Sequence, residues 1–170
     1  MRSLRRTETD PIQVNSAIRQ LQTRAFPSWQ TIIKPANETA VNNTYQDDDS
    51  LTFPVEASTT YRFRFVCMYD TPTAADLKIQ LTGPASPTLI QALVVTNAPA
   101  AVALVTVMWT AFSTSQSITS ASTTAGAFTI DGVLQNGTTA GNVTLQWAQV
   151  TSSGTSTMYA GSYVEFSTFS

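Results

Sequence analysis

One stretch of the chain alternates strictly between apolar and polar positions, and this period constrains the fold more than any other feature. Apolar, mostly aromatic side chains occupy every second position, at Tyr61, Phe63, Phe65, Cys67 and Tyr69. Arginines Arg62 and Arg64 fall between them. Successive side chains of a β-strand point to opposite faces, so the stretch predicts one long strand with a buried aromatic face.

The same alternation recurs after residue 51, between short segments rich in glycine and proline. Examples are the runs 77–82 and 143–147, and the apolar run 89–95 indicates a further strand. The pair Asn136-Gly137 is typical of a β-hairpin turn. Repeated strands with such turns predict an all-β chain, an antiparallel jelly-roll-like β-sandwich of about eight strands.

Three tryptophans and one dense apolar run bear on the core of this sandwich. The run from Val102 to Phe112 is rich in Val, Leu, Met and Trp, and we expect it to be buried on both faces. Trp109 and Trp147 follow the strand period, which predicts core positions for both. Trp29 lies outside the strand block, and its location stays open.

The N-terminal part has a different pattern, which predicts a short helix. Asp10 is a good N-cap, Pro11 suits the first helical position, and Gln13 completes a capping box. The helical spacing i, i+3, i+4, i+7 is then filled by apolar Val14, Ala17, Ile18 and Leu21. We therefore divide the chain into an arm with a short amphipathic helix, residues 1–34, and a β-sandwich, residues 35–170.

Charge is scarce and unevenly distributed. Charged residues make up 12 % of the chain, about half the ~25 % of typical soluble domains. Residues 1–34 hold six bases and two acids, a net +4, and residues 35–170 hold three bases and nine acids, a net −6. Two interpretations stay open: the uncharged surface is buried in an assembly, or threonine simply suits exposed strands.

The absence of histidine and the presence of one cysteine, Cys67, exclude much chemistry. No Ser-His-Asp or Cys-His site, no histidine or multi-cysteine zinc site and no disulfide within the chain can form. Asp131 and Glu165 are isolated acids that the sequence cannot place together. We expect no enzyme activity, no cofactor and no metal, and no run of apolar residues is long enough for a membrane helix.

Three groups of residues are candidates for contacts with partners. Arg2, Arg5 and Arg6 form either a basic anchoring arm or a solvated terminus, and no motif accompanies them that would indicate nucleic-acid binding. Asp47, Asp48 and Asp49 form the single acidic cluster. They lack the alternation and the glycine of a calcium loop, which leaves a solvated turn or cap, or pairing with arginines of a neighbouring chain. The polar stretch 113–124 predicts a surface loop, with either a solvating or a binding role.

Several motifs resemble those of virion proteins of tailed bacteriophages. The segment from Asp10 to Leu21 resembles the N-terminal helix of head-fibre and tail-fibre proteins. The stretch from Asn43 to Phe65, with Leu51-Thr-Phe-Pro-Val-Glu-Ala57 at its centre, is similar to a β-sandwich module of phage virions. Leu77-Lys-Ile-Gln-Leu-Thr-Gly-Pro84 and Leu145-Gln-Trp-Ala-Gln149 fit the same module.

The resemblance implies a trimeric, jelly-roll-like protein that decorates or cements a capsid, made in the cytoplasm of a host bacterium and located on the virion surface. Its expected partners are the major capsid protein and further copies of itself, with no membrane. The expected anchor consists of Arg2, Arg5, Arg6, Val14, Ile18 and Leu21. The alternative is a head-fibre or tail-fibre module that binds glycans of the host surface.

Overall fold

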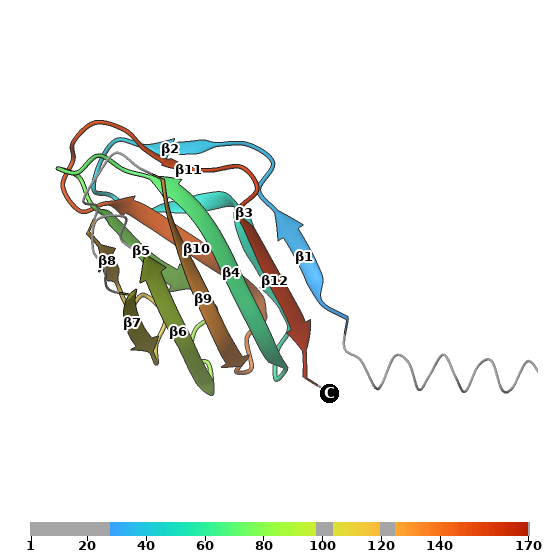
Figure 1. Ribbon diagram of the computed structural model, residues 1–170. Coiled ribbons are helices and arrows are strands. Elements are labelled where there is room, and N and C mark those ends of the chain that lie inside the picture. Colours follow the sequence, from blue (N-terminus) through green and yellow to red (C-terminus); the bar gives the residue numbers. More distant parts are fainter. Residues whose placement is uncertain (1–27, 98–103, 120–124, 170) are drawn as a thin grey trace, which may run out of the picture.

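The described residues form two antiparallel β-sheets packed face to face (Figure 1). The computed structural model describes residues 28–97, 104–119 and 125–169. The strands of these residues are β1 (Gln30–Ile33), β2 (Glu38–Ala40), β3 (Gln46–Val55), β4 (Thr60–Asp70), β5 (Leu77–Thr82), β6 (Leu89–Asn97), β7 (Leu104–Trp109), β8 (Gln116–Ile118), β9 (Gly126–Gln135), β10 (Gly141–Gln149), β11 (Ser156–Met158) and β12 (Tyr163–Thr168). The all-β prediction is confirmed, while the expected number of about eight strands is too low.

The larger sheet has the order β1-β12-β4-β9-β6-β7, with β2 and β11 attached at one end of β4. The smaller sheet has the order β3-β10-β5-β8. Pairing is nested along the chain, because β1 pairs with β12, β3 with β10, β4 with β9, and β5 with β8. The β6–β7 hairpin lies between β5 and β8 in sequence and extends the larger sheet beyond β9.

The core is the layer between the sheets, and the alternation in β4 is confirmed. Its five alternate residues from Tyr61 to Tyr69 are each no more than 4 % exposed. From the smaller sheet, Phe53 stacks on Phe166 with ring centroids 4.7 Å apart. The ring centroids of Phe53 and Phe63 lie 5.8 Å apart. Trp109 and Trp147 are 1 % and 0 % exposed, which confirms their predicted core positions.

The hairpin predicted at Asn136-Gly137 is wrong, because this turn joins strands of different sheets. It follows β9 of the larger sheet and precedes β10 of the smaller one. The Asn136 side chain donates hydrogen bonds to the carbonyls of Glu56 and Thr139, which binds the turn to neighbouring loops. A Cβ at Gly137 would lie 2.3 Å from the Ser86 carbonyl oxygen, so a close backbone approach requires glycine here.

The run from Val102 to Phe112 is the second correction. We expected burial on both faces, but in β7 only Trp109 is buried, and Leu104 and Met108 are 68 % and 59 % exposed. The reason is position: among the described residues β7 is the edge strand of the larger sheet, with β6 as its one neighbour.

The expected N-terminal helix lies outside the described residues. Of the expected arm, residues 1–34, the structure describes only residues 28–34. Residues 30–33 form β1 and pair with β12, so they belong with the sandwich. The division into an arm and a sandwich otherwise stays a prediction.

Replacing Phe53 with alanine removes the ring through which the smaller sheet contacts the aromatic face of the larger one. We expect a loss of about 3–5 kcal/mol in the free energy of unfolding, the range for Phe→Ala in a packed core. Urea unfolding followed by tryptophan fluorescence measures it. The exposed Thr138→Ala serves as control, and equal midpoints for the two variants would contradict the central position of Phe53.

Candidate functional site

The residues predicted from sequence as contacts fall into two groups. Arg2, Arg5, Arg6, Val14, Ile18 and Leu21 lie outside the described residues. Asp47, Asp48 and Asp49 lie on β3, at the end of the sandwich where β2 crosses. Only Asp47 and Asp49 of this run are exposed, and Asp48 is 2 % exposed.

Asp48 is held inside its own subunit by a lysine that sequence reasoning missed. Lys34, directly after β1, donates from Nζ to Asp48 Oδ1 over 2.9 Å and to Glu38 Oε2 over 2.5 Å. Asp48 Oδ1 also accepts the backbone N–H groups of Ser50 and Leu51. The Lys34 and Asp48 side chains are 1 % and 0 % exposed. Pairing with a neighbouring chain therefore stays a prediction for Asp47 and Asp49 alone.

The electrostatics of this cluster keep the lysine charged. Burial by itself lowers the pKa of Lys34, but the hydrogen bonds and charges of Glu38 and Asp48 outweigh burial and raise the pKa above its ordinary 10.5. A lysine held as an ammonium ion is a poor nucleophile. The cluster therefore clamps the end of β1 to β2 and β3.

The lone cysteine, Cys67, is also unreactive. Cys67 is completely buried, and burial, followed by the nearby charge of Asp48, raises the pKa of its thiol well above 9.0. The thiolate is the reactive form, so this side chain is a small core hydrophobe. Burial likewise raises the pKa of Tyr69 to about 12.

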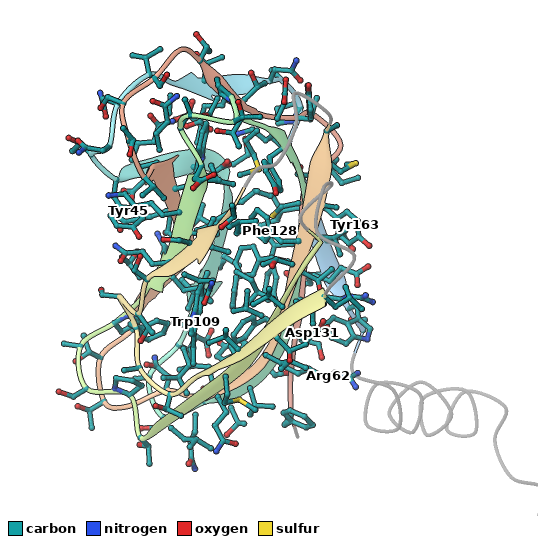
Figure 2. The ribbon with its side chains drawn as sticks, turned by 60° about the vertical axis from the view of Figure 1, so that its left-hand side comes forward. Tyr45, Arg62, Trp109, Phe128, Asp131 and Tyr163 are labelled. Carbon is teal, nitrogen blue, oxygen red and sulfur yellow. The ribbon has the colours of Figure 1, made fainter. Side chains whose placement is uncertain are left out.

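The outer face of the larger sheet carries a shallow groove of about 350 Å³. This outer-face groove crosses from the start of β1 over β4 and β9 to β6 and β7, and its principal lining side chains are Trp29, Arg62, Leu93, Met108, Asp131 and Val133. Figure 2 shows Arg62 and Asp131 at this face, apart from the buried Phe128.

Both charges of the groove are held by neighbours within the sandwich. The Arg62 guanidinium lies 4.4 Å from the centroid of the Trp29 ring, a cation–π contact, and its Nε donates to Ser167 Oγ. Asp131 pairs with Arg64 at 3.3 Å, with both side chains about half exposed. Such an exposed pair contributes little stability. The Arg64 and Asp131 side chains can therefore rearrange around a ligand at low cost in free energy.

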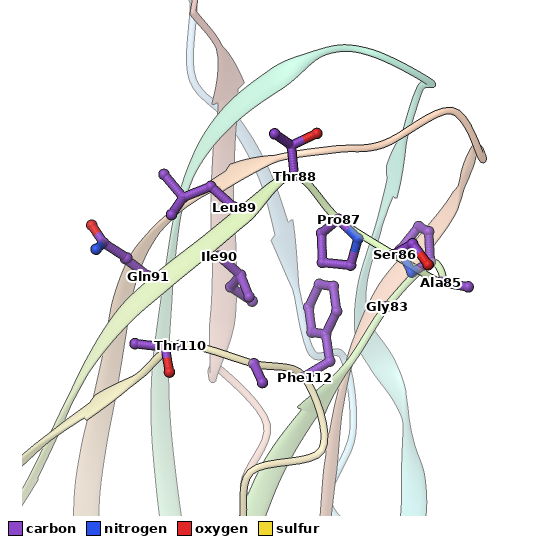
Figure 3. A pocket seen from close by; sticks show the side chains of 12 residues that line it. Gly83, Ala85, Ser86, Pro87, Thr88, Leu89, Ile90, Gln91, Thr110 and Phe112 are labelled. Atoms are coloured by element: carbon purple, nitrogen blue, oxygen red, sulfur yellow. The ribbon is translucent and has the colours of Figure 1, made fainter.

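A second hollow, of about 530 Å³, lies between the loop 83–88 and the end of β7 (Figure 3). Its lining is uncharged, with hydroxyl groups from Ser86, Thr88 and Thr110. The Phe112 ring fills space beside Gly83, where a Cβ would lie 2.2 Å from the ring. The ring therefore packs against the backbone, and the hollow contains no acid or base for catalysis.

Five of the eleven large apolar side chains that are exposed in the described ranges lie on β6 and β7. Besides Leu104 and Met108, the side chains of Leu89, Leu93 and Val105 are 40–42 % exposed. Neither β6 nor β7 contains a charged residue. Natural sheets usually protect an edge strand with charge or proline, and an unprotected apolar edge marks a contact surface.

Two negative findings concern the described ranges 28–97, 104–119 and 125–169. They contain no helix long and apolar enough to span a membrane. They also place no group of three or more histidine, cysteine, aspartate or glutamate side chains together for a metal ion.

Among solved structures, the fold has a distant similarity to a viral protein. No family model matches, and no curated protein matches. A chain in the structure of the Gx strain of infectious bursal disease virus aligns with 84 % of this chain at 11 % identity and a TM-score of 0.24. This chain spans 40 % of that one.

Replacing Lys34 with methionine leaves Asp48 buried without its cation. We expect a loss of about 3–5 kcal/mol in the free energy of unfolding, as for other broken buried pairs. Because the pKa of Lys34 is raised from 10.5, the stability that its charge contributes is complete below pH 10.5 and is lost as the pH rises through the higher folded value. Urea unfolding over a pH series should therefore show the gap between wild type and K34M narrowing above pH 10.5.

Lys78→Met is the matched control for this experiment. Lys78 is partly exposed and contacts the Tyr45 ring, with Nζ 4.7 Å from its centroid. Its loss should cost less than about 1 kcal/mol. If both variants unfold alike, Lys34 is not a clamp.

Proposed function

We propose that this chain is a structural protein of a virion without enzyme activity, a decoration or cement protein that binds an assembled capsid and stabilises it. The observation that carries the proposal is the uncharged, apolar edge formed by β6 and β7, where Leu104 and Val105 are exposed on a strand with one neighbour. A free monomer relies on surface charge for solubility, and apolar edges of this kind pack against other proteins.

The nested strand order supports the fold part of the proposal, a jelly roll. The four pairs β1·β12, β3·β10, β4·β9 and β5·β8 are those of one long hairpin rolled into two four-stranded layers. Jelly rolls occur in viral capsid proteins and in lectins. The remaining strands are additions: the β6–β7 hairpin widens one layer, and β2 with β11 covers one end.

Capsid binding is proposed for the N-terminal arm, with the major capsid protein as partner. The described sandwich contains four bases and nine acids, whereas residues 1–27 contain five arginines against Glu8 and Asp10. A basic arm is attracted to an acidic capsid surface, and any protein that binds only the assembled shell stabilises it by linkage. The proposed location is the virion surface of a bacteriophage, after synthesis in the bacterial cytoplasm.

Deletion of residues 1–24 should abolish co-sedimentation with purified heads that lack this protein. The sandwich should stay folded, since the deletion leaves every buried residue of the described ranges, and all twelve strands, in place. The triple variant R2A/R5A/R6A separates charge from the apolar stripe: it should weaken binding and reduce its dependence on salt.

Normal head binding by the truncated protein would contradict the anchoring role. Binding of the full chain to host cells in the absence of heads would instead favour a glycan-binding fibre module. For that function the uncharged hollow at Phe112 is the place to test.

Self-association, proposed as a trimer, should depend on the exposed edge. The double variant Leu104→Lys, Val105→Lys places charge on β7, and charge blocks edge-to-edge packing. We expect the mass measured by light scattering to fall from trimer to monomer while the circular dichroism spectrum stays that of the folded β-sandwich. Val150→Lys, at an exposed apolar position away from the hairpin, is the control. An unchanged mass for the double variant would exclude this edge as the interface.

A further inference from the structure

We propose that the outer-face groove is the docking site for a segment of the same chain, residues 10–24, whose apolar stripe covers the groove while the protein is free. The inference concerns one chain alone and does not depend on the virion function.

The groove presents an apolar surface that nothing within the described sandwich covers. Trp29, Leu93 and Met108 line it and are 43 %, 40 % and 59 % exposed. Leu93 and Met108 are direct cross-strand partners in the β6–β7 pair, so they form one continuous apolar step. Val133, on β9, adds to its floor. A contiguous apolar patch on a sheet face is the usual receptor of an amphipathic helix.

The segment has the matching shape. In the helix that the sequence predicts, its apolar residues Val14, Ala17, Ile18 and Leu21 share one side. Fifteen residues of helix are about 22 Å long. The path from β1 to β7 has five inter-strand gaps, about 24 Å in total. The segment can therefore lie across the whole sheet face with its stripe on the groove.

The groove is closer to the segment of its own chain than to that of another copy, because the chain enters the sandwich beside it. The described residues begin at Ser28, and the next residue, Trp29, itself lines the groove under the Arg62 guanidinium. From Leu21 to Trp29 the chain spans at most about 28 Å, enough to turn back over the sheet. A short tether gives an effective concentration of order mM, far above that of a second molecule in dilute solution.

Charge is complementary as well. Arg24 follows Leu21 by three residues, a spacing that puts both on the same side of the predicted helix. On the groove, the half-exposed Asp131 is bound only by the exposed arginine Arg64 in the described residues. The segment from Asp10 to Arg24 has a net charge of +1, with Arg19 and Arg24 against Asp10, opposite in sign to the sandwich.

Cysteine cross-linking of the free, full-length protein tests the inference. The variant Ile18→Cys, Met108→Cys places one thiol on the stripe and one on the groove. Under a mild oxidant it should form a disulfide within one chain, seen as a faster-migrating monomer on a non-reducing gel. The native Cys67 does not interfere, because it is completely buried.

The matched control is Gln20→Cys, Met108→Cys, which has nearly the same tether but a thiol on the opposite side of the helix. It should cross-link several-fold more slowly. Equal rates would show a loose arm without docking, and disulfides between two chains would show that a second copy fills the groove. Either result overturns the inference. The cross-linking experiment uses no capsids, so a failure of head binding does not contradict docking of the segment. Likewise, a failure of cross-linking does not contradict the proposed capsid binding.

Discussion

The packing of aromatic rings between the two sheets is the interaction on which the rest of the structure depends. Phe53 of the smaller sheet contacts Tyr61, Phe63, Phe65 and Phe166 of the larger one, with ring centroids 4.7–6.3 Å apart. No disulfide is possible with a single cysteine, so burial of apolar area is the main driving force that holds the sheets together. The buried clamp of Lys34 and Asp48 then attaches the end of β1 to this core.

The contact surfaces follow from an imbalance between the sheets. The larger sheet is six strands wide along its main path, and the smaller one is four. The outer part of the β6–β7 hairpin therefore extends past its cover. On β7, Trp109 is 1 % exposed, yet Val105 is 42 % exposed although both belong to the inward-pointing set. Residues with core composition thus lie at the surface, where they are available to an arm, a second copy or a capsid.

Sequence patterns predicted the fold well where the signal was local. The period of β4 and the core positions of Trp109 and Trp147 depend only on alternation along one strand. The predictions failed where contacts between segments distant in the sequence determine the structure. The turn at Asn136 has the residues of a hairpin, but the strands on either side find different sheets. The clamp at Lys34 was missed because its acids come from two other strands, and a lone lysine before a proline gives no local signal.

The amino-acid sequence by itself determined the class of this protein: β-strands from the alternation, no histidine chemistry, a basic arm and an acidic sandwich poor in charge. These properties depend on composition and on neighbours in the chain. Only the tertiary structure decided that the dense apolar run ends at an exposed edge and that Asp48 is buried with Lys34. It also decided that Trp29 and Met108, far apart in sequence, line the same groove. Burial is a property of what packs above a residue, and that is settled by strand order and sheet width.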